Sequence, residues 1–230
     1  ATVATANNDH RLGANEAPPA IISIFLGEQL TDVIEGIEHG GAKQSAQGGT
    51  IKIGVSSLPA LPRDATDRNR TSPFAFTGNK FEFRAVGSSQ SCAGSNVALN
   101  TIVANAMDEV CTKLEADVKS GKKFNEALQA VLRDIVKKHK RILFNGDNYT
   151  DEWKKEAARR GLPNVTKTPA ALKALIDSDV EAMFEKYAVL SKRELKSRYD
   201  VYLHAYEQSV AIEANVALTM ARTGIAPAAF

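Results

Sequence analysis

The sequence has few of the features that mark secreted, membrane or nucleic-acid-binding proteins. Its 230 residues include two cysteines, too few for a disulfide framework, and neither has the spacing of a metal-ligand pair. No apolar run approaches the roughly 20 residues that a membrane-spanning helix needs, and there is no signal-peptide pattern. The net charge is only +2, and the basic residues are interleaved with acidic ones. We therefore expect a cytoplasmic protein that binds neither membranes nor nucleic acid.

The composition that remains is that of a globular protein, with 43% hydrophobic and 24% charged residues. A chain of this length can form one sizeable core or two modest ones. The sequence starts at Ala1 without a methionine and stops at Phe230 just after a helical pattern. We expect it to be a piece of a longer protein.

The first part of the chain, up to about residue 110, is rich in loops and short strand patterns. The apolar run over residues 20–26 predicts a strand buried on both faces, and alternation over residues 50–55 predicts a half-buried strand. Between them, apolar spacing predicts a helix over residues 28–37. Residues 56–73 are predicted to be irregular, and a loop of that length in a compact domain is usually functional or disordered.

The second part is predicted to be helical. Apolar stripes indicate one helix from Ser95 to Val118 and another from Phe124 towards Leu143. Further helix starts are indicated at Thr150, at Thr168 with Pro169 in the first helical position, and by the capping boxes Ser178–Glu181 and Ser191–Glu194. Helix ends are predicted at Gly161 and by Gly224. The expected fold class is α+β, with one domain over residues 1–110 and a helical one over residues 111–230.

Residues 80–84 alternate strictly between charged and aromatic side chains. Because successive side chains of a strand point to opposite faces, Phe81 and Phe83 are expected to enter a core, and Lys80, Glu82 and Arg84 to share the other face. Two interpretations stay open. Glu82 and Arg84 can pair with each other on an exposed face. Alternatively, the face is a cavity wall, where a carboxylate holds a hard cation and a guanidinium holds phosphate or carboxylate oxygens.

Several ordered segments resemble glutamine synthetase, and specifically its type III class. They are NDHRLGANEAPP over residues 8–19, with Arg11-Leu12 and Glu16-Ala17-Pro18, then Asn69-Arg70-Thr71, then Glu82-Phe83-Arg84. The type III resemblance continues through FNGDNYTDEWKKEAARRGLPN, residues 144–164, and the last helix. It covers essentially the whole chain.

The resemblance implies an ATP-dependent ligase that joins ammonia to L-glutamate through a γ-glutamyl phosphate. It implies two or three divalent ions, Mg or Mn, and ATP as co-substrate. The chain would be the later part of the catalytic domain, where an antiparallel sheet forms a barrel-like wall of the active site, followed by the helical extension of the type III class. The whole enzyme would be a homo-oligomer of stacked rings, a dodecamer, with sites at subunit interfaces.

The resemblance also assigns roles to five residues of this sequence. Arg11 would bind glutamate, and Glu16 would lie on the flap that closes over the intermediate and helps to bind and deprotonate ammonium. Arg70 would stabilise the nucleotide phosphates and the transferred phosphoryl group. Glu82 would ligate a divalent ion, and Arg84 would meet the substrate carboxylate or phosphate.

The sequence departs from the commoner classes just after Arg70. Those classes carry another arginine where this chain has Pro73-Phe74-Ala75-Phe76, so Arg68 or Arg63 is the candidate for a second phosphate contact. The family's upstream metal ligands and its small β-grasp domain have no counterpart in this sequence. The leading hypothesis is therefore a fragment of an active enzyme that is inactive alone, and the alternative is a non-catalytic homologue or domain with a regulatory or assembly role.

Overall fold

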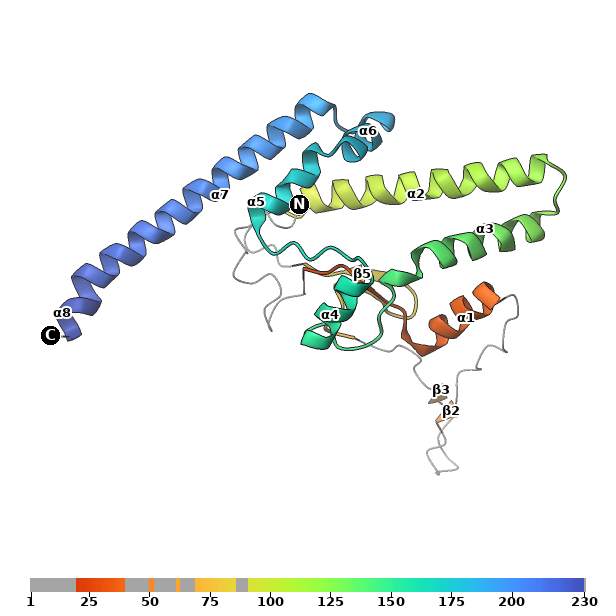
Figure 1. Cartoon of the computed structure of the whole chain (residues 1–230), viewed down its shortest axis with the longest axis horizontal. Helices are drawn as coiled ribbons and strands as arrows, with labels where there is room; N and C mark the ends of the chain where they lie inside the picture. Colours follow the sequence, from red (N-terminus) through yellow and green to blue (C-terminus); the bar gives the residue numbers. More distant parts are fainter. Residues whose placement is uncertain (1–19, 40–49, 52–60, 63–68, 86–90, 230) are drawn as a thin grey trace. The chain divides into compact units, whose positions relative to one another are not determined.

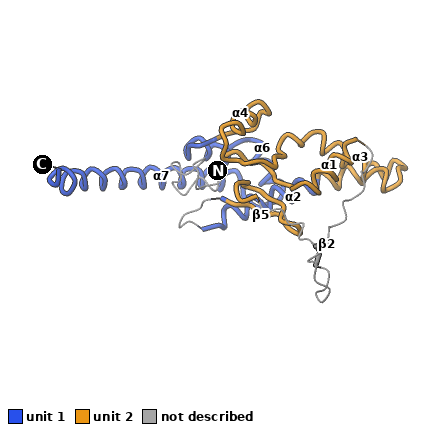
Figure 2. Tube along the Cα trace, turned by 90° about the horizontal axis from the view of Figure 1, so that it is seen from below, with its two compact units in different colours: residues 1–17, 85–108, 165–230 blue, residues 18–84, 109–164 orange. Residues whose placement is uncertain are grey.

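The computed structural model describes residues 20–39, 50–51, 61–62, 69–85 and 91–229. These residues are mostly helical and include a small three-stranded sheet. They belong to two compact units, shown in Figure 2: the described residues within 85–108 and 165–229 form unit 1, and those within 20–84 and 109–164 form unit 2. The predicted domain boundary near residue 110 stays a prediction.

The sheet of unit 2 has the strand order β1 (Ile24–Phe25), β4 (Phe74–Phe76), β5 (Phe81–Phe83). β1 is parallel to β4, and β4 and β5 form an antiparallel hairpin in which Ala75 lies opposite Glu82. The strand predicted over residues 20–26 is confirmed only at Ile24–Phe25, and the expected burial on both faces is wrong for Ile22, which is 49% exposed. β2 (Thr50–Ile51) pairs with β3 (Leu61–Pro62), and the rest of the strand predicted over residues 50–55 lies outside the described residues.

The helices that lie wholly in unit 2 are α1 (Gly27–His39), α3 (Phe124–His139) and α4 (Asp151–Arg159), which Figure 1 labels, and the 3₁₀ turn η2 (Lys140–Ile142). α4 begins where predicted, because the Thr150 hydroxyl accepts a hydrogen bond from the Trp153 amide. Trp153 is 1% exposed and packs with Ile21, Ala157 and Leu162. The Phe144 ring stacks on it with a centroid separation of 3.8 Å. Burial of each such large side chain contributes about 1.5–3 kcal/mol.

Unit 1 contains α5 (Thr168–Leu172), the 3₁₀ turn η3 (Lys173–Ile176), α6 (Ser178–Lys186) and α7 (Lys192–Met220). α7 starts with the predicted capping box, in which Ser191 accepts from the Glu194 amide and the Glu194 carboxylate accepts from the Ser191 amide. α7 contacts η3, α5 and α6, and the buried apolar residues of this region are Leu172, Leu175, Phe184 and Leu195.

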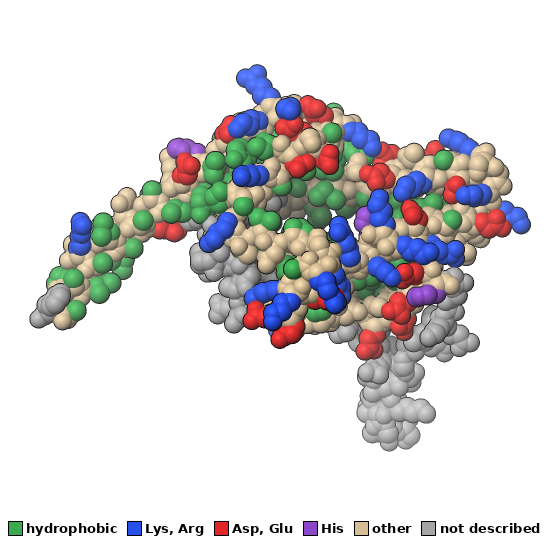
Figure 3. Space-filling view, in the orientation of Figure 1, with side chains coloured by type: hydrophobic (Ala, Val, Ile, Leu, Met, Phe, Trp, Pro, Cys, Tyr) green, Lys and Arg blue, Asp and Glu red, His purple; other side chains and the backbone are tan. Residues whose placement is uncertain are grey.

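Beyond Leu195, α7 has no other buried residue, and hydrophobic side chains lie exposed along it (Figure 3): Val201, Val210, Ile212, Val216, Leu218 and Met220. The prediction that this helix ends by Gly224 is wrong. It continues through the π-helix η4 (Ala221–Ile225) into α8 (Ala226–Ala229). A glycine within a helix lowers its stability but does not end it, so the stop signal was too weak here.

Three other helix starts differ from the sequence patterns. α2 (Ala93–Lys119) begins two residues before Ser95, and Ile102, Val103 and Val118 of its predicted apolar stripe are exposed. The cap of α6 is Asp177, whose carboxylate accepts from the Asp179 amide, so Ser178 is the first helical residue. Thr168 is likewise the first residue of α5, so this helix begins one residue earlier than predicted. No described helix is long and apolar enough to cross a membrane.

Candidate functional site

Three of the predicted site residues, Arg70, Glu82 and Arg84, lie in the described part of unit 2. They come from the β4–β5 hairpin and from the segment just before it. The other predicted residues lie outside the described residues: Arg11, Glu16, Arg63 and Arg68.

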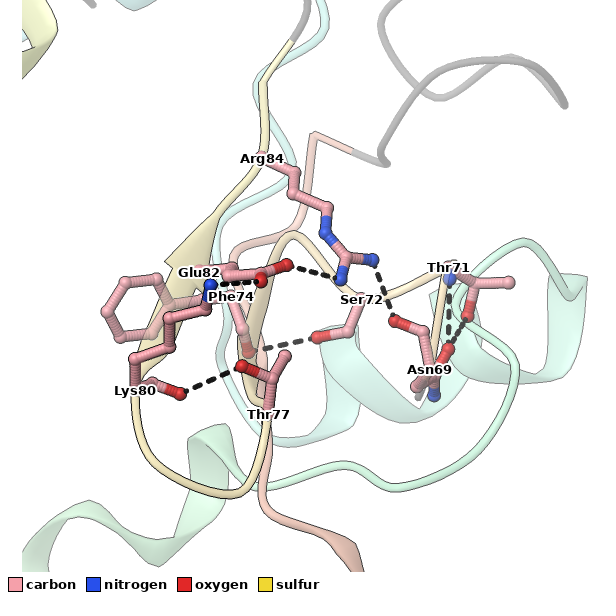
Figure 4. A network of polar contacts seen from close by, with 8 residues as sticks. All are labelled: Asn69, Thr71, Ser72, Phe74, Thr77, Lys80, Glu82 and Arg84. Atoms are coloured by element: carbon pink, nitrogen blue, oxygen red, sulfur yellow. Dashed lines mark hydrogen bonds and ion pairs between the residues drawn. The ribbon is translucent and has the colours of Figure 1, made fainter. Parts of the chain in front are cut away.

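Glu82 lies at the centre of β5, and its carboxylate is held by two cations (Figure 4). Arg84 Nη2 donates to Glu82 Oε2 at 2.9 Å, and Lys80 Nζ lies 3.4 Å from Oε1. Strand alternation puts Lys80, Glu82 and Arg84 on one face, as predicted. The hydrogen bond from Arg84 and the charge of Lys80 lower the pKa of Glu82 below 4.5, although partial desolvation opposes them. The pairing of Glu82 with Arg84 is confirmed, and both side chains are half-buried rather than exposed. That this face is a cavity wall stays a prediction.

The opposite face of the hairpin carries the aromatic side chains. The Phe81 ring lies 5.5 Å from that of Phe74 and 5.2 Å from that of Phe76, measured between centroids. Phe83 is half-buried, but Phe81 is 48% exposed, so the expectation that both enter a core is wrong for Phe81. Alternation determines which face a side chain occupies, but it does not determine whether anything covers that face.

Arg84 also links Glu82 to the segment that carries Arg70. Its Nη1 donates to the Asn69 carbonyl at 3.0 Å, as Figure 4 shows. The Asn69 side-chain carbonyl accepts from the Thr71 amide at 2.9 Å and from the Thr71 hydroxyl at 2.7 Å, which forms a tight polar turn around Arg70. Arg70 itself is exposed and forms no hydrogen bond or ion pair with another described residue.

This turn is anchored from the other side by the loop before α4. The Asn69 amide group donates to the Gly146 carbonyl at 2.8 Å, and the Asn148 backbone amide donates to the Thr71 hydroxyl at 3.0 Å. Asn148 is fully buried, and its side-chain oxygen accepts from the Ser23 hydroxyl at 2.5 Å. Sequence reasoning missed Asn148 and Gly146, because these bonds join residues 77 positions apart and leave no local pattern.

The described residues alone do not make a metal site. No group of three or more His, Cys, Asp and Glu residues suited to a metal ion occurs among them. Glu82 supplies one carboxylate, whereas Mg or Mn prefers several oxygen ligands. Any further protein ligands would have to come from residues beyond the described ones.

Comparisons with known proteins identify the family. Residues 127–230 match the model of the glutamine synthetase C-terminal domain. The chain is 44% identical over 230 residues to the type-3 glutamine synthetase of Dictyostelium discoideum, a match that covers 100% of this chain and 31% of the relative. It is 41% identical over 232 residues to the glutamine synthetase of Bacteroides fragilis, with 100% and 32% covered. A glutamine synthetase of Butyrivibrio fibrisolvens is 42% identical over 212 residues, with 92% and 30% covered.

The chain thus spans about a third of the length of the relatives that it matches. The two matches that cover all of it include both the hairpin with Glu82 and the last helix. The resemblance inferred from the sequence motifs is therefore confirmed, and the chain belongs to the glutamine synthetase family.

Proposed function

We propose that this chain is part of an enzyme that ligates ammonia to L-glutamate with ATP, through a γ-glutamyl phosphate intermediate. The observation that carries this proposal is the similarity of the whole chain to proteins named glutamine synthetase. The arrangement of Arg70, Glu82 and Arg84 supports it, because these residues combine an exposed guanidinium with a carboxylate–guanidinium pair on neighbouring segments.

Arg70 is proposed to stabilise the phosphates of ATP and the phosphoryl group during its transfer. Phosphoryl transfer depends mainly on positioning and on cationic groups around the transferred phosphate. An exposed guanidinium on a hydrogen-bonded turn suits both requirements, because its backbone is fixed and its donors form no bond with another described residue. Arg68 is proposed as a second phosphate contact.

Arg84 is proposed to bind the carboxylate or phosphate of the substrate. A guanidinium has five N–H donors, and here two of its nitrogens bond Glu82 and the Asn69 carbonyl, so further donors remain for a ligand. Its side chain is 26% exposed, which leaves it accessible. Arg11 is proposed to bind glutamate, and Glu16 to lie on a flap that binds and deprotonates ammonium and keeps water from the acyl phosphate.

Glu82 is proposed as one ligand of a divalent ion, Mg or Mn. A carboxylate has about four lone-pair positions, so contacts to Arg84 and Lys80 leave room for a metal bond. A bound ion would offset phosphate charge. We further propose that the sheet is part of a barrel-like wall of the active site, and that the whole cytoplasmic enzyme is a dodecamer of stacked rings.

The test uses the longer protein that contains these residues. It should form γ-glutamyl hydroxamate from glutamate and hydroxylamine with ATP and Mn or Mg. Arg70→Ala should lower kcat about 10²–10³-fold, the usual loss for one electrostatic stabiliser of the transition state. Arg159→Ala, which removes a 78% exposed arginine, is the matched control and should leave kcat unchanged. The 230-residue chain by itself should show no measurable turnover.

Glu82→Ala should lower the rate and also raise the concentration of Mg or Mn needed for half-maximal activity. The control is Glu115→Ala, which removes an exposed glutamate that is also paired with a lysine and should change neither quantity. Unchanged metal dependence in Glu82→Ala would mean that Glu82 serves only as the partner of Arg84. A full-length protein that binds its regulatory partners but forms no product would instead favour the non-catalytic alternative.

A further inference from the structure

The turn that presents Arg70 is held by hydrogen bonds on both sides of that residue, while the arginine side chain forms no bond with another described residue. On the Asn69 side, the backbone carbonyl accepts from Arg84 and the side chain donates to the Gly146 carbonyl. On the Thr71 side, the hydroxyl accepts from the Asn148 backbone amide. Hydrogen bonds that fix the backbone on both sides of an exposed residue also fix the position of its Cα atom. They therefore limit the positions that the end of its side chain can occupy.

Asn148 connects this turn to the interior of unit 2. Its side-chain oxygen accepts from the buried Ser23 hydroxyl, and its side-chain amide lies 3.4 Å from the Gly146 carbonyl, which Asn69 also uses. Ser23 and Asn148 are both 0% exposed. A buried amide bonded in this way holds one orientation, because losing a partner leaves a desolvated polar atom without a bond.

We propose that Asn148 is a positioning residue for Arg70, through Thr71 and Asn69. Among the described residues, the loop of residues 145–148 forms no hydrogen bond with the side chains of Arg70, Glu82 or Arg84. It would then contribute to catalysis by fixing the turn that carries the phosphate-binding arginine. This inference rests on the proposed function of Arg70, and it adds the means by which that residue is held in place.

Asparagine suits this position because the site uses an acceptor towards Ser23 and a donor towards Gly146 on one short side chain. Aspartate would keep the acceptor but lose the donor and put a negative charge in a buried place. Alanine would lose both. Thr71 has a matching dual role, since its hydroxyl donates to Asn69 and accepts from Asn148.

The test is a double-mutant cycle in the full-length enzyme, with kcat and KM measured separately. Asn148→Ala and Thr71→Val should each lower kcat about 10–100-fold, the size expected when a reacting group moves by about 1 Å, with KM for glutamate unchanged. Thr71→Ser keeps the hydroxyl and should restore the wild-type kcat. In an Arg70→Ala background, Asn148→Ala and Thr71→Val should cause no further loss, because the residue that they position is gone.

Thr77→Val is the matched control for Thr71→Val. Its hydroxyl lies in the turn of the same hairpin, 3.3 Å from the Lys80 carbonyl, and does not contact the Asn69–Thr71 turn, so kcat should not change. If Asn148→Ala does not fold, the Thr71 variants alone decide the question. Losses that multiply with that of Arg70→Ala would overturn the positioning role and leave the proposed function intact. A wild-type kcat in Arg70→Ala would instead overturn the proposed role of Arg70.

Discussion

Helices α4 and α6 end in the same backbone motif but use different residues to form it. After each helix the chain enters the left-handed region, at Gly161 with φ 69° and at Ala188 with φ 51°. In each case two successive amides bond back to the last turn: Gly161 to Ala158, Leu162 to Ala157, Ala188 to Glu185 and Val189 to Phe184. This is the Schellman arrangement, which satisfies carbonyl groups that the helix end would otherwise leave free.

The two ends differ in the burial of the residue after the left-handed position. Leu162, after α4, is 8% exposed and joins the core around Trp153, whereas Val189, after α6, is 40% exposed. The same hydrogen bonds therefore place Leu162 in the core of unit 2, whereas in unit 1 they end the helix without burying Val189. The comparison shows that a helix-ending motif is independent of burial, and that burial then decides how much a substitution there costs.

The largest expected effect separates Leu162 from Val189. Leu162→Ala should lower the free energy of unfolding by about 2–5 kcal/mol, because it opens a cavity beside Trp153. Val189→Ala should change it by no more than about 0.5 kcal/mol, as for most exposed positions. Urea titrations of both variants, followed by circular dichroism, measure the difference. Equal losses would mean that the two ends are equivalent after all.

A smaller effect should come from exchanging the residues in the left-handed position. Gly161→Ala should add about 1–2 kcal/mol of strain, although its Cβ would meet only ordinary contacts, and the stiffer unfolded chain should offset about 0.4–1 kcal/mol of that cost. Ala188→Gly should relieve similar strain but lose about 0.4–1 kcal/mol to the freer unfolded chain, a net gain of up to about 1.6 kcal/mol. Urea titrations again measure both changes. Changes of the same sign in the two variants would contradict the comparison.

The smallest effect concerns pH. Near the end of α4, the hydrogen bond from Arg160 lowers the pKa of Glu156, so its stabilising effect is present above pH 4.5 and is lost as the pH falls through the folded-state pKa. In α6, the hydrogen bond to Asp108 raises the pKa of Lys186, so this effect is present below pH 10.5 and is lost as the pH rises through the folded-state pKa.

Variants isolate the two contributions. Glu156→Gln should reduce the loss of unfolding free energy in acid, and Lys186→Met should reduce the loss in alkali, when each is compared with the wild type across pH. Asp108, whose pKa is lowered mainly by its bond to Lys186, adds an acid-side loss to α6 as well. An alkaline effect in Glu156→Gln would show that the two helix ends are coupled.

The α4 end could be predicted from the sequence and the α6 end could not. Thr150 is a local signal for the start of α4, and Gly161 is a local signal for its end. The capping box of Ser191 and Glu194 is likewise a local signal for the start of α7. Ala188 carries no such signal, because alanine is a strong helix former that the Schellman bonds hold in an unfavourable conformation here.

The candidate site shows the same limit. Alternation predicted which face Glu82 and Arg84 share, and the motif around Arg70 pointed to the family. The alternation could not predict that Phe81 stays exposed, because exposure depends on what else packs on the sheet. Nor could it predict the bond from Asn148 to Thr71, since partners 77 residues apart are brought together only by the folded chain.

The position of Trp153 gives the chain a built-in optical probe of one unit. It is the single tryptophan in the sequence, it is buried against the Phe144 ring, and the Arg160 guanidinium lies 5.4 Å from its ring centroid. Its emission should be blue-shifted and should turn red when α4 leaves its core. α7 contains tyrosines but no tryptophan, so melting of that helix should change the far-ultraviolet dichroism without changing the tryptophan emission. The two spectra, recorded in one titration, therefore distinguish a single transition from two.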